Sequence, residues 1–182
     1  MRIISGIYGG RRFDTPKNLQ ARPTTDLAKG ALFNILTNRL ELEGLSALDL
    51  FAGTGSIGFE LVSRGAQKVV SVEKNSIQQN YIEKIHQLLG LDHRHILLRT
   101  DVFRYIKSGC EQFDFIFADP PYDLPQLESI PSRVLDENCL LHPGGLFVLE
   151  HSRNNDFTQH PWFAEHRVYG SVNFTFFVRP EE

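Results

Sequence analysis

The spacing of apolar residues along this chain changes near residue 45. From Asp26 they recur at spacings of three and four, which predicts a helix with Thr24 or Thr25 as its N-cap. After Gly44, apolar runs of strand length alternate with helical segments. We expect strands over residues 47–51, 68–72, 96–99, 113–118 and 146–150, and helices ending near residue 64 and spanning 76–89, 102–108 and about 133–138.

Strands that alternate with helices predict a parallel sheet with right-handed crossovers. Residues 165–169 and 172–179 alternate with period two around a turn near Gly170, which predicts a closing antiparallel hairpin. Short apolar runs in residues 2–13, broken by glycines, predict a small hairpin at the start. The expected fold is therefore α/β and Rossmann-like, with a mostly parallel seven-stranded sheet in residues 45–182 and an extension in residues 1–44.

Charge is distributed unevenly along the chain, so the net charge of −3 does not describe its two parts. Residues 1–39 carry +5 and the remainder carries −8. A basic arm on an acidic body attracts phosphate even when the whole protein is acidic. We expect the extension to bind nucleic acid, although a solvated basic surface without a partner remains the alternative.

The length of 182 residues, with 41% hydrophobic and 23% charged residues, suits one globular domain. No apolar run approaches the roughly 18 residues needed to span a bilayer, and the first residues do not resemble a signal peptide. Cys110 and Cys139 show no metal or redox spacing, and the seven histidines are scattered. We expect a cytoplasmic protein with reduced thiols, without a metal site or a membrane partner.

Acidic residues follow three neighbouring strands of the predicted sheet. Asp49 precedes a glycine-rich turn over residues 53–58, Glu73 ends the next strand, and Asp101 follows the third. Carboxylates at these strand ends suit an ammonium, ribose hydroxyls and an adenine amino group. The glycine spacing also fits a dinucleotide site, but Asp49 would repel a pyrophosphate. S-adenosylmethionine has an ammonium and no phosphate, so it is the favoured ligand over a nicotinamide cofactor or a turn without ligand.

The tetrad Asp119-Pro120-Pro121-Tyr122 follows the fourth strand. The Asp119 carboxylate and the Pro120 carbonyl can each accept one hydrogen of an exocyclic amine, which frees the nitrogen lone pair for attack on a methyl group. The Tyr122 ring can stack on the target base. A proline-rich turn with a core tyrosine is the alternative interpretation, but the nucleoside-binding pattern around the tetrad favours amine methylation.

With these motifs, the chain resembles the class I S-adenosylmethionine-dependent methyltransferases. Segments 2–6 (RIISG), 10–13 (GRRF), 22–26 (RPTTD) and 32–34 (LFN) narrow the resemblance to the RsmD family over nearly the whole chain. That family methylates N2 of one guanine of bacterial 16S ribosomal RNA, at the site conventionally numbered 966. The resemblance implies that the partner is 16S rRNA in the small ribosomal subunit or an assembly intermediate, and that the cofactor is S-adenosylmethionine.

The predicted site residues divide into three groups. Two positions depart from the family pattern: Leu27 and Gly30 stand where the family commonly has arginine and glutamate. At position 122, many members have phenylalanine where this chain has Tyr122. The catalytic group is Asp119, Pro120, Pro121 and Tyr122; the cofactor-binding group is Asp49, Phe51, Gly53, Thr54, Gly55, Glu73, Asp101 and Val102; the RNA-binding group is Arg2, Arg11, Arg12, Arg22, Thr24, Thr25 and Lys29.

Three other functions are compatible with parts of this pattern. A DNA methyltransferase acting on adenine N6 or cytosine N4 uses the same tetrad, but such enzymes usually carry a sizeable recognition domain, and only about 45 residues precede the first strand here. A ribosome-assembly factor without catalysis would not need the complete set of site residues. A nicotinamide-dependent oxidoreductase is the most distant alternative. No apolar stripe calls for a second copy, so we expect a monomer.

Overall fold

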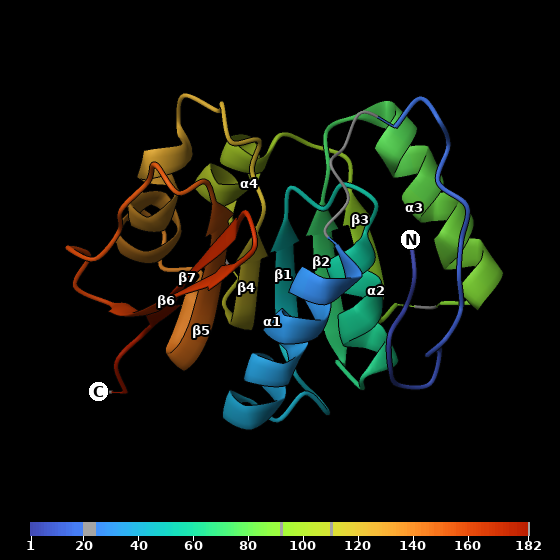
Figure 1. Cartoon of the computed structure of the whole chain (residues 1–182), viewed down its shortest axis with the longest axis horizontal. Coiled ribbons are helices and arrows are strands. Elements are labelled where there is room, and N and C mark those ends of the chain that lie inside the picture. Colours follow the sequence, from blue (N-terminus) through green and yellow to red (C-terminus); the bar gives the residue numbers. More distant parts are fainter. Residues whose placement is uncertain (20–24, 92, 110, 182) are drawn as a thin grey trace.

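The computed structural model describes residues 1–19, 25–91, 93–109 and 111–181. A seven-stranded sheet with the order β3-β2-β1-β4-β5-β7-β6 forms its centre (Figure 1). Strands β1 to β5 pair in parallel, and β7 lies antiparallel between β5 and β6. The predicted sheet and its closing hairpin are confirmed. The strands are β1 (Ser46–Leu50), β2 (Lys68–Val72), β3 (His95–Leu98), β4 (Phe113–Ala118), β5 (Leu141–His151), β6 (Phe163–Tyr169) and β7 (Val172–Val178).

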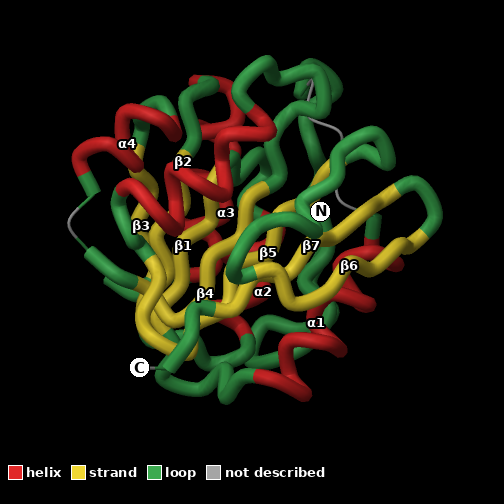
Figure 2. Tube along the Cα trace, turned by 90° about the vertical axis from the view of Figure 1, so that its left-hand side faces the viewer, coloured by secondary structure: helices red, strands yellow, loops and turns green. Residues whose placement is uncertain are grey.

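Helices cover both faces of the sheet (Figure 2). One hydrophobic cluster joins α1, α2 and α3 to one face, and a second joins α4, η1 and η2 to the other. The largest differences from the prediction are that β5 begins at Leu141 rather than at residue 146 and that the segment near residue 133 is a π-helix. Other strand ends shift by one or two residues. The helices are α1 (Asp26–Arg39), α2 (Ser56–Ser63), α3 (Ser76–Leu89), α4 (Val102–Ser108), the 3₁₀-helix η1 (Leu127–Ser129) and the π-helix η2 (Ser132–Glu137).

Side-chain caps set the starts of three helices. The Thr25 hydroxyl accepts a hydrogen bond from Ala28 N at the start of α1, while Thr24 lies outside the described residues. Asn75 and Asp101 cap α3 and α4 in the same way. A capping side chain satisfies amide donors that have no partner inside the helix, so each cap specifies where the helix begins. Asn75 and Asp101 follow β2 and β3, which places both helix starts at the carboxyl ends of the parallel strands.

The first thirteen residues fold back on themselves and pack against α2. They form one isolated bridge, between Arg2 and Arg12, rather than a regular hairpin. Tyr8 N donates to Ser63 Oγ at 3.0 Å, and Ile7 N donates to Ser63 O at 2.8 Å. Gly6 makes this approach possible, because its φ is 83° and an added Cβ would lie 1.8 Å from Ser63 O. The extension is therefore attached to the helix that follows the glycine-rich turn.

A buried ion pair joins α1, α2 and this extension. Glu60 is fully buried, and its carboxylate accepts hydrogen bonds from Ile4 N at 2.7 Å, Ser5 N at 3.0 Å and Arg64 Nε at 2.8 Å. Lys29 Nζ lies 3.2 Å from Glu60 Oε2, and the Lys29 side chain is 1% exposed. Burial lowers the pKa of Lys29, while the Glu60 carboxylate opposes that shift. The prediction that Lys29 contacts RNA is wrong for this structure, because its ammonium is enclosed and already paired.

Replacing Glu60 by alanine is expected to lower the free energy of unfolding by about 3 to 5 kcal/mol, because it leaves the Lys29 ammonium buried without its counterion. Urea unfolding measures the change. The matched control is Glu83→Ala, which breaks an exposed ion pair with Arg99 at 3.8 Å and should cost less than about 1 kcal/mol. Equal losses in the two variants would contradict a structural role for the buried pair.

Within the described ranges, no helix is long and apolar enough to cross a membrane, and no group of three or more His, Cys, Asp or Glu side chains is arranged to hold a metal ion. Some histidines instead make structural contacts inside the sheet. His151 Nε2 lies 2.7 Å from Thr175 Oγ1, and His142 Nδ1 lies 2.9 Å from Asp114 Oδ1. These contacts tie β5 to its neighbours β7 and β4.

Candidate functional site

A cleft of about 490 Å³ lies at the carboxyl ends of β1, β2 and β4. This is the edge at which open α/β sheets bind ligands. Every predicted catalytic residue lines the cleft, and so does every predicted cofactor-binding residue except Gly55. Gly55 is the N-cap residue of α2, with a φ of 74°. The strand order therefore brings together polar groups as far apart in the sequence as Asp49 and Glu150.

Asp49 lies at the base of the cleft with an exposed fraction of 1%. Its Oδ2 accepts a hydrogen bond from Gly58 N at 3.2 Å and from Ser71 Oγ at 3.4 Å. Its Oδ1 accepts none from the residues that the structure describes, which leaves one oxygen for a ligand. Burial raises the pKa of Asp49 from 3.8 to about 7, and the nearby Glu73 carboxylate adds to the rise. A cation in the cleft would restore the ionised form.

A polar chain behind the cleft supports Asp49. Ser71 Oγ lies 3.0 Å from Nε2 of His95, a buried residue of β3. Burial lowers the pKa of His95 to about 3, so the ring is neutral at physiological pH. Gly58 leaves room for this chain, because a Cβ there would lie 2.7 Å from Ser71 Oγ. The third glycine of the turn is thus required by packing against polar groups rather than by backbone conformation.

Glu73 holds the glycine-rich turn in place. Its Oε2 accepts a hydrogen bond from Gly53 N at 2.9 Å, and its Oε1 accepts one from Asn75 N at 2.8 Å. Each carboxylate oxygen has a further lone pair, and the Gln78 amide nitrogen lies 2.7 Å from Oε2 and 3.2 Å from Oε1, so a ligand hydroxyl would compete with Gln78 for Glu73. The same side chain therefore orders the turn and presents acceptors to a ligand.

Asp101 and Phe51 form the far wall of the cleft. Asp101 Oδ1 accepts hydrogen bonds from Phe103 N at 3.0 Å and Arg104 N at 3.2 Å, and its Oδ2 lies 3.9 Å from Lys74 Nζ. Phe51 has a φ of 61°, an uncommon backbone conformation for a side chain of this size. Its ring meets Phe103 edge-on, with centroids 6.2 Å apart. The part of the cleft beside Val102 is therefore bounded by an acceptor and an aromatic side chain.

The tetrad begins where β4 ends beside β1. Asp119 N donates to Leu50 O at 3.4 Å, which holds the start of the tetrad next to the end of β1. The Tyr122 hydroxyl donates to Glu150 Oε1 at 2.8 Å. Glu150 lies at the end of β5, is 4% exposed and lines the same cleft. Its hydrogen bond fixes the direction of the Tyr122 ring, which a phenylalanine at this position would lack.

Glu150 is a cleft residue that the sequence reasoning missed. The signal was present, since an acid ends the apolar run at residues 146–150, as Asp119 follows the run at 113–118. Predicting that β5 lies next to β4 would have placed both acids at one edge of the sheet. The parallel pairing of Ala118 with Leu149 confirms that neighbourhood.

The predicted RNA-binding residues occupy different environments. Arg11 and Arg12 are exposed, and Arg11 lies over the Tyr8 ring at 5.3 Å. Arg2 lies 3.9 Å from Asp26, and Thr25 lines the cleft while it caps α1. Arg22 and Thr24 lie outside the described residues. Their role and that of the exposed arginines remain predictions.

The strand order, the glycine-rich turn after β1 and the acids at successive strand ends define a Rossmann-like fold of the class I methyltransferase type. The chain belongs to the family described as conserved hypothetical protein 95, whose model matches residues 1–178. Curated relatives of the chain carry the name ribosomal RNA small subunit methyltransferase D, which confirms the resemblance to the RsmD family.

Two curated relatives of that name and one solved structure match over most of their length. The ribosomal RNA small subunit methyltransferase D of Haemophilus influenzae is 34% identical over 153 residues, 82% of this chain and 78% of its own. The Escherichia coli protein of the same name is 27% identical, over 98% of this chain and 90% of its own. The solved structure of the Escherichia coli protein yhhF is 26% identical with a TM-score of 0.87, and covers 100% of this chain and 99% of its own.

Proposed function

We propose that this protein transfers a methyl group from S-adenosylmethionine to the exocyclic N2 of one guanine, position 966 by convention, in 16S rRNA of the small ribosomal subunit. One observation carries the proposal: the nucleoside-type acids Asp49, Glu73 and Asp101 share a single cleft with the Asp119 tetrad. The names of the relatives support ribosomal RNA as the substrate. The choice of guanine N2 rests on the family resemblance.

The donors and acceptors of the cleft fit S-adenosylmethionine. The free Oδ1 of Asp49 suits the ammonium, and Glu73 suits the two ribose hydroxyls. Asp101 suits the adenine amino group, with Val102 and Phe51 against the ring. The bound cofactor would supply an electrophilic methyl group. No carboxylate in this arrangement would have to face a phosphate, which is the difference from a dinucleotide site.

The tetrad would hold the amine that receives the methyl group. The Asp119 carboxylate and the Pro120 carbonyl can accept the two amine hydrogens, which turns the nitrogen lone pair out of conjugation with the base. Asp119 can also take the proton that the amine loses after transfer. Tyr122, oriented by Glu150, can stack on a base that has left its helix. Positioning and electrostatics would therefore provide most of the rate acceleration.

The exposed part of the N-terminal segment would bind RNA. No carboxylate among the described residues forms an ion pair with Arg11 or Arg12, so both cations are available to phosphates. The segment is held against α2 through Glu60 and Ser63. Ser56, at the start of the same helix, lines the cleft. RNA bound by the segment would thus lie near the reacting groups.

Incubation of the protein with methyl-labelled S-adenosylmethionine and either 30S subunits, 16S rRNA or duplex DNA tests the function. We expect label in the ribosomal RNA only, as N2-methylguanosine at one position after nuclease digestion. Label in DNA alone would show that the protein is instead a DNA amino-methyltransferase. Binding of 16S rRNA without methyl transfer would indicate an assembly factor.

A further inference from the structure

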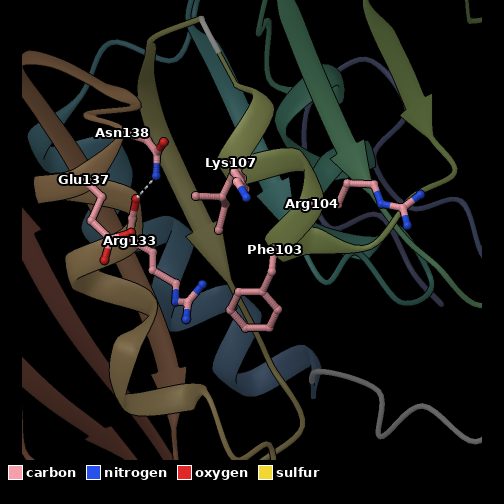
Figure 3. A pocket seen from close by; sticks show the side chains of 7 residues that line it. Phe103, Arg104, Lys107, Arg133, Glu137 and Asn138 are labelled. Carbon is pink, nitrogen blue, oxygen red and sulfur yellow. Dashed lines mark hydrogen bonds between the residues drawn. The ribbon is translucent and has the colours of Figure 1, made fainter.

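A second pocket, of about 640 Å³, opens between α4 and η2, and the reaction proposed above does not use it. We call it the α4–η2 pocket. Figure 3 shows its lining side chains, which come from both helices. Three of the lining residues are basic and one is acidic, although the whole chain has a net charge of −3. The lining residues are Phe103, Arg104, Ile106, Lys107, Arg133, Glu137 and Asn138.

Arg133 is held in place rather than solvated freely. Its Nε donates a hydrogen bond to Ser129 Oγ at 3.0 Å, and its guanidinium lies over the Phe103 ring at 5.2 Å (Figure 3). Asn138 Nδ2 donates to Arg133 O at 2.9 Å within the same turn. A guanidinium that is already ordered loses little side-chain entropy when it binds an anion. The π-helix η2 thus presents a preorganised cation beside an aromatic face.

The basic side chains of this pocket have no carboxylate partner among the residues that the structure describes. No acid among the described residues lies within ion-pair distance of Arg104, Lys107 or Arg133, whereas Lys68 and Arg99 elsewhere on the surface are paired. In Figure 3, Arg104 extends away from Arg133, and Lys107 is seen between the two arginines. Cations that spread along a groove, instead of converging on a point, suit a chain of phosphates better than a single phosphate ion.

The α4–η2 pocket shares a wall with the cofactor cleft. Val102 lines the cleft, and its neighbour Phe103 lines the pocket. Phe51 of the cleft meets Phe103 edge-on. The segment that leaves the tetrad at Tyr122 leads into η1 and then η2. A polymer whose target base enters the cleft therefore has neighbouring residues within reach of this pocket.

We propose that the α4–η2 pocket is a second RNA-binding surface, which holds the backbone phosphates of single-stranded substrate RNA beside the target nucleotide. This inference rests on the proposed function, because it takes ribosomal RNA as the substrate. The chemistry fits RNA: Arg104 and Lys107 face solvent as phosphate ligands, and the Arg133 guanidinium, which lies over the Phe103 ring, offers a surface for one unpaired base.

A pair of charge reversals tests the proposal. Arg104→Glu with Lys107→Glu should lower the affinity for a 16S rRNA transcript by about tenfold and make the slope of log K against log salt shallower by about 1.4, the value for two lost phosphate contacts. The matched control, Lys68→Glu with Lys84→Glu, changes net charge equally at two residues that do not line the pocket and should leave both quantities nearly unchanged. Filter binding over a salt series measures them.

Several outcomes would overturn the proposal. If the two pairs of substitutions lower RNA affinity equally, only net charge matters. If the slope of log K against log salt is unchanged in the pocket variant, the RNA phosphates bind elsewhere on the protein. Competition by millimolar inorganic phosphate would indicate a single-anion site. If the double variant also loses S-adenosylmethionine affinity and so is misfolded, Arg133→Gln answers the question, with an expected slope change of about 0.7. Absence of methyl transfer by the unmodified protein would refute the proposed function, but the RNA-binding comparison would still be readable.

Discussion

Asp119→Ala is expected to lower the turnover number for methyl transfer by at least about 10² to 10³-fold, the usual cost of losing a group that stabilises the transition state. The carboxylate oxygen would no longer accept an amine hydrogen, so the nitrogen lone pair would stay conjugated with the base. Affinity for S-adenosylmethionine should stay within a few-fold, because Asp49, Glu73 and Asp101 are unchanged. Single-turnover kinetics with 30S subunits and cofactor titration by calorimetry measure the two effects separately.

Asp123→Ala is the matched control for this variant. Asp123 follows the tetrad directly, is exposed and does not line the cleft. Its removal deletes the same charge from the same loop, so it should leave turnover nearly unchanged. A near-normal rate for Asp119→Ala, or an equal loss for Asp123→Ala, would contradict the role that we assign to Asp119.

The second large effect concerns Asp49 and pH. Because the pKa of Asp49 is raised to about 7 by burial, the empty protein holds it largely protonated at pH 6. A protonated carboxyl cannot pair with the cofactor ammonium, so affinity for S-adenosylmethionine should fall about tenfold per pH unit below pH 7. Asp49→Asn should bind weakly at every pH and lose this dependence. Calorimetric titrations between pH 5.5 and about pH 8.5 test the prediction.

The same variant should be more stable than the parent protein when no cofactor is present. The folded state holds the Asp49 proton more tightly than the unfolded chain does, so this group's contribution to stability falls as the pH rises from 3.8 to about 7. Above that window Asp49→Asn should gain on the order of 2 to 4 kcal/mol in urea unfolding. The gain should disappear toward pH 4, and a constant difference at all pH values would exclude ionisation as the cause.

Ser71→Ala separates the charge of Asp49 from the packing around it. The Ser71 hydroxyl lies 3.4 Å from Asp49 Oδ2, and its hydrogen bond lowers the pKa of that carboxyl. Removing the hydroxyl should therefore move the pH profile of cofactor binding to higher pH without changing the limiting affinity. A profile that stays in place would show that Ser71 only fills space next to Gly58.

Local patterns were sufficient to predict most of the fold. The alternating runs correctly placed five parallel strands and the closing hairpin, and Thr25 was confirmed as one of the two predicted caps. The secondary-structure prediction was less accurate where contacts between distant segments override local sequence preference. The start of β5 at Leu141 depends on pairing with Phe113 across an irregular register, and the segment at residue 133 adopts a π-helix, which no periodicity of the sequence specifies.

Charge patterns in the sequence did not show which basic residues face solvent. Lys29 belonged to a basic segment and was assigned to RNA binding, yet it lies buried against Glu60. The sequence pattern did not indicate a site at Arg104, Lys107 and Arg133, because they are spread over thirty residues in an acidic part of the chain. Only packing decides whether a cation is paired, enclosed or available.

The sequence by itself determined which chemistry is possible in this protein: acids and glycines at strand ends, and the Asp119 tetrad after β4. Those features are local, because a strand, a turn and a following residue are specified within about ten positions. The tertiary structure decided which of these groups meet. Parallel pairing of β4 with β5 brought Glu150 to Tyr122, packing between α1 and α2 enclosed Lys29, and contact between α4 and η2 formed a basic pocket beside the cleft. These contacts form when segments that are far apart in the sequence pack together, so no single segment specifies them.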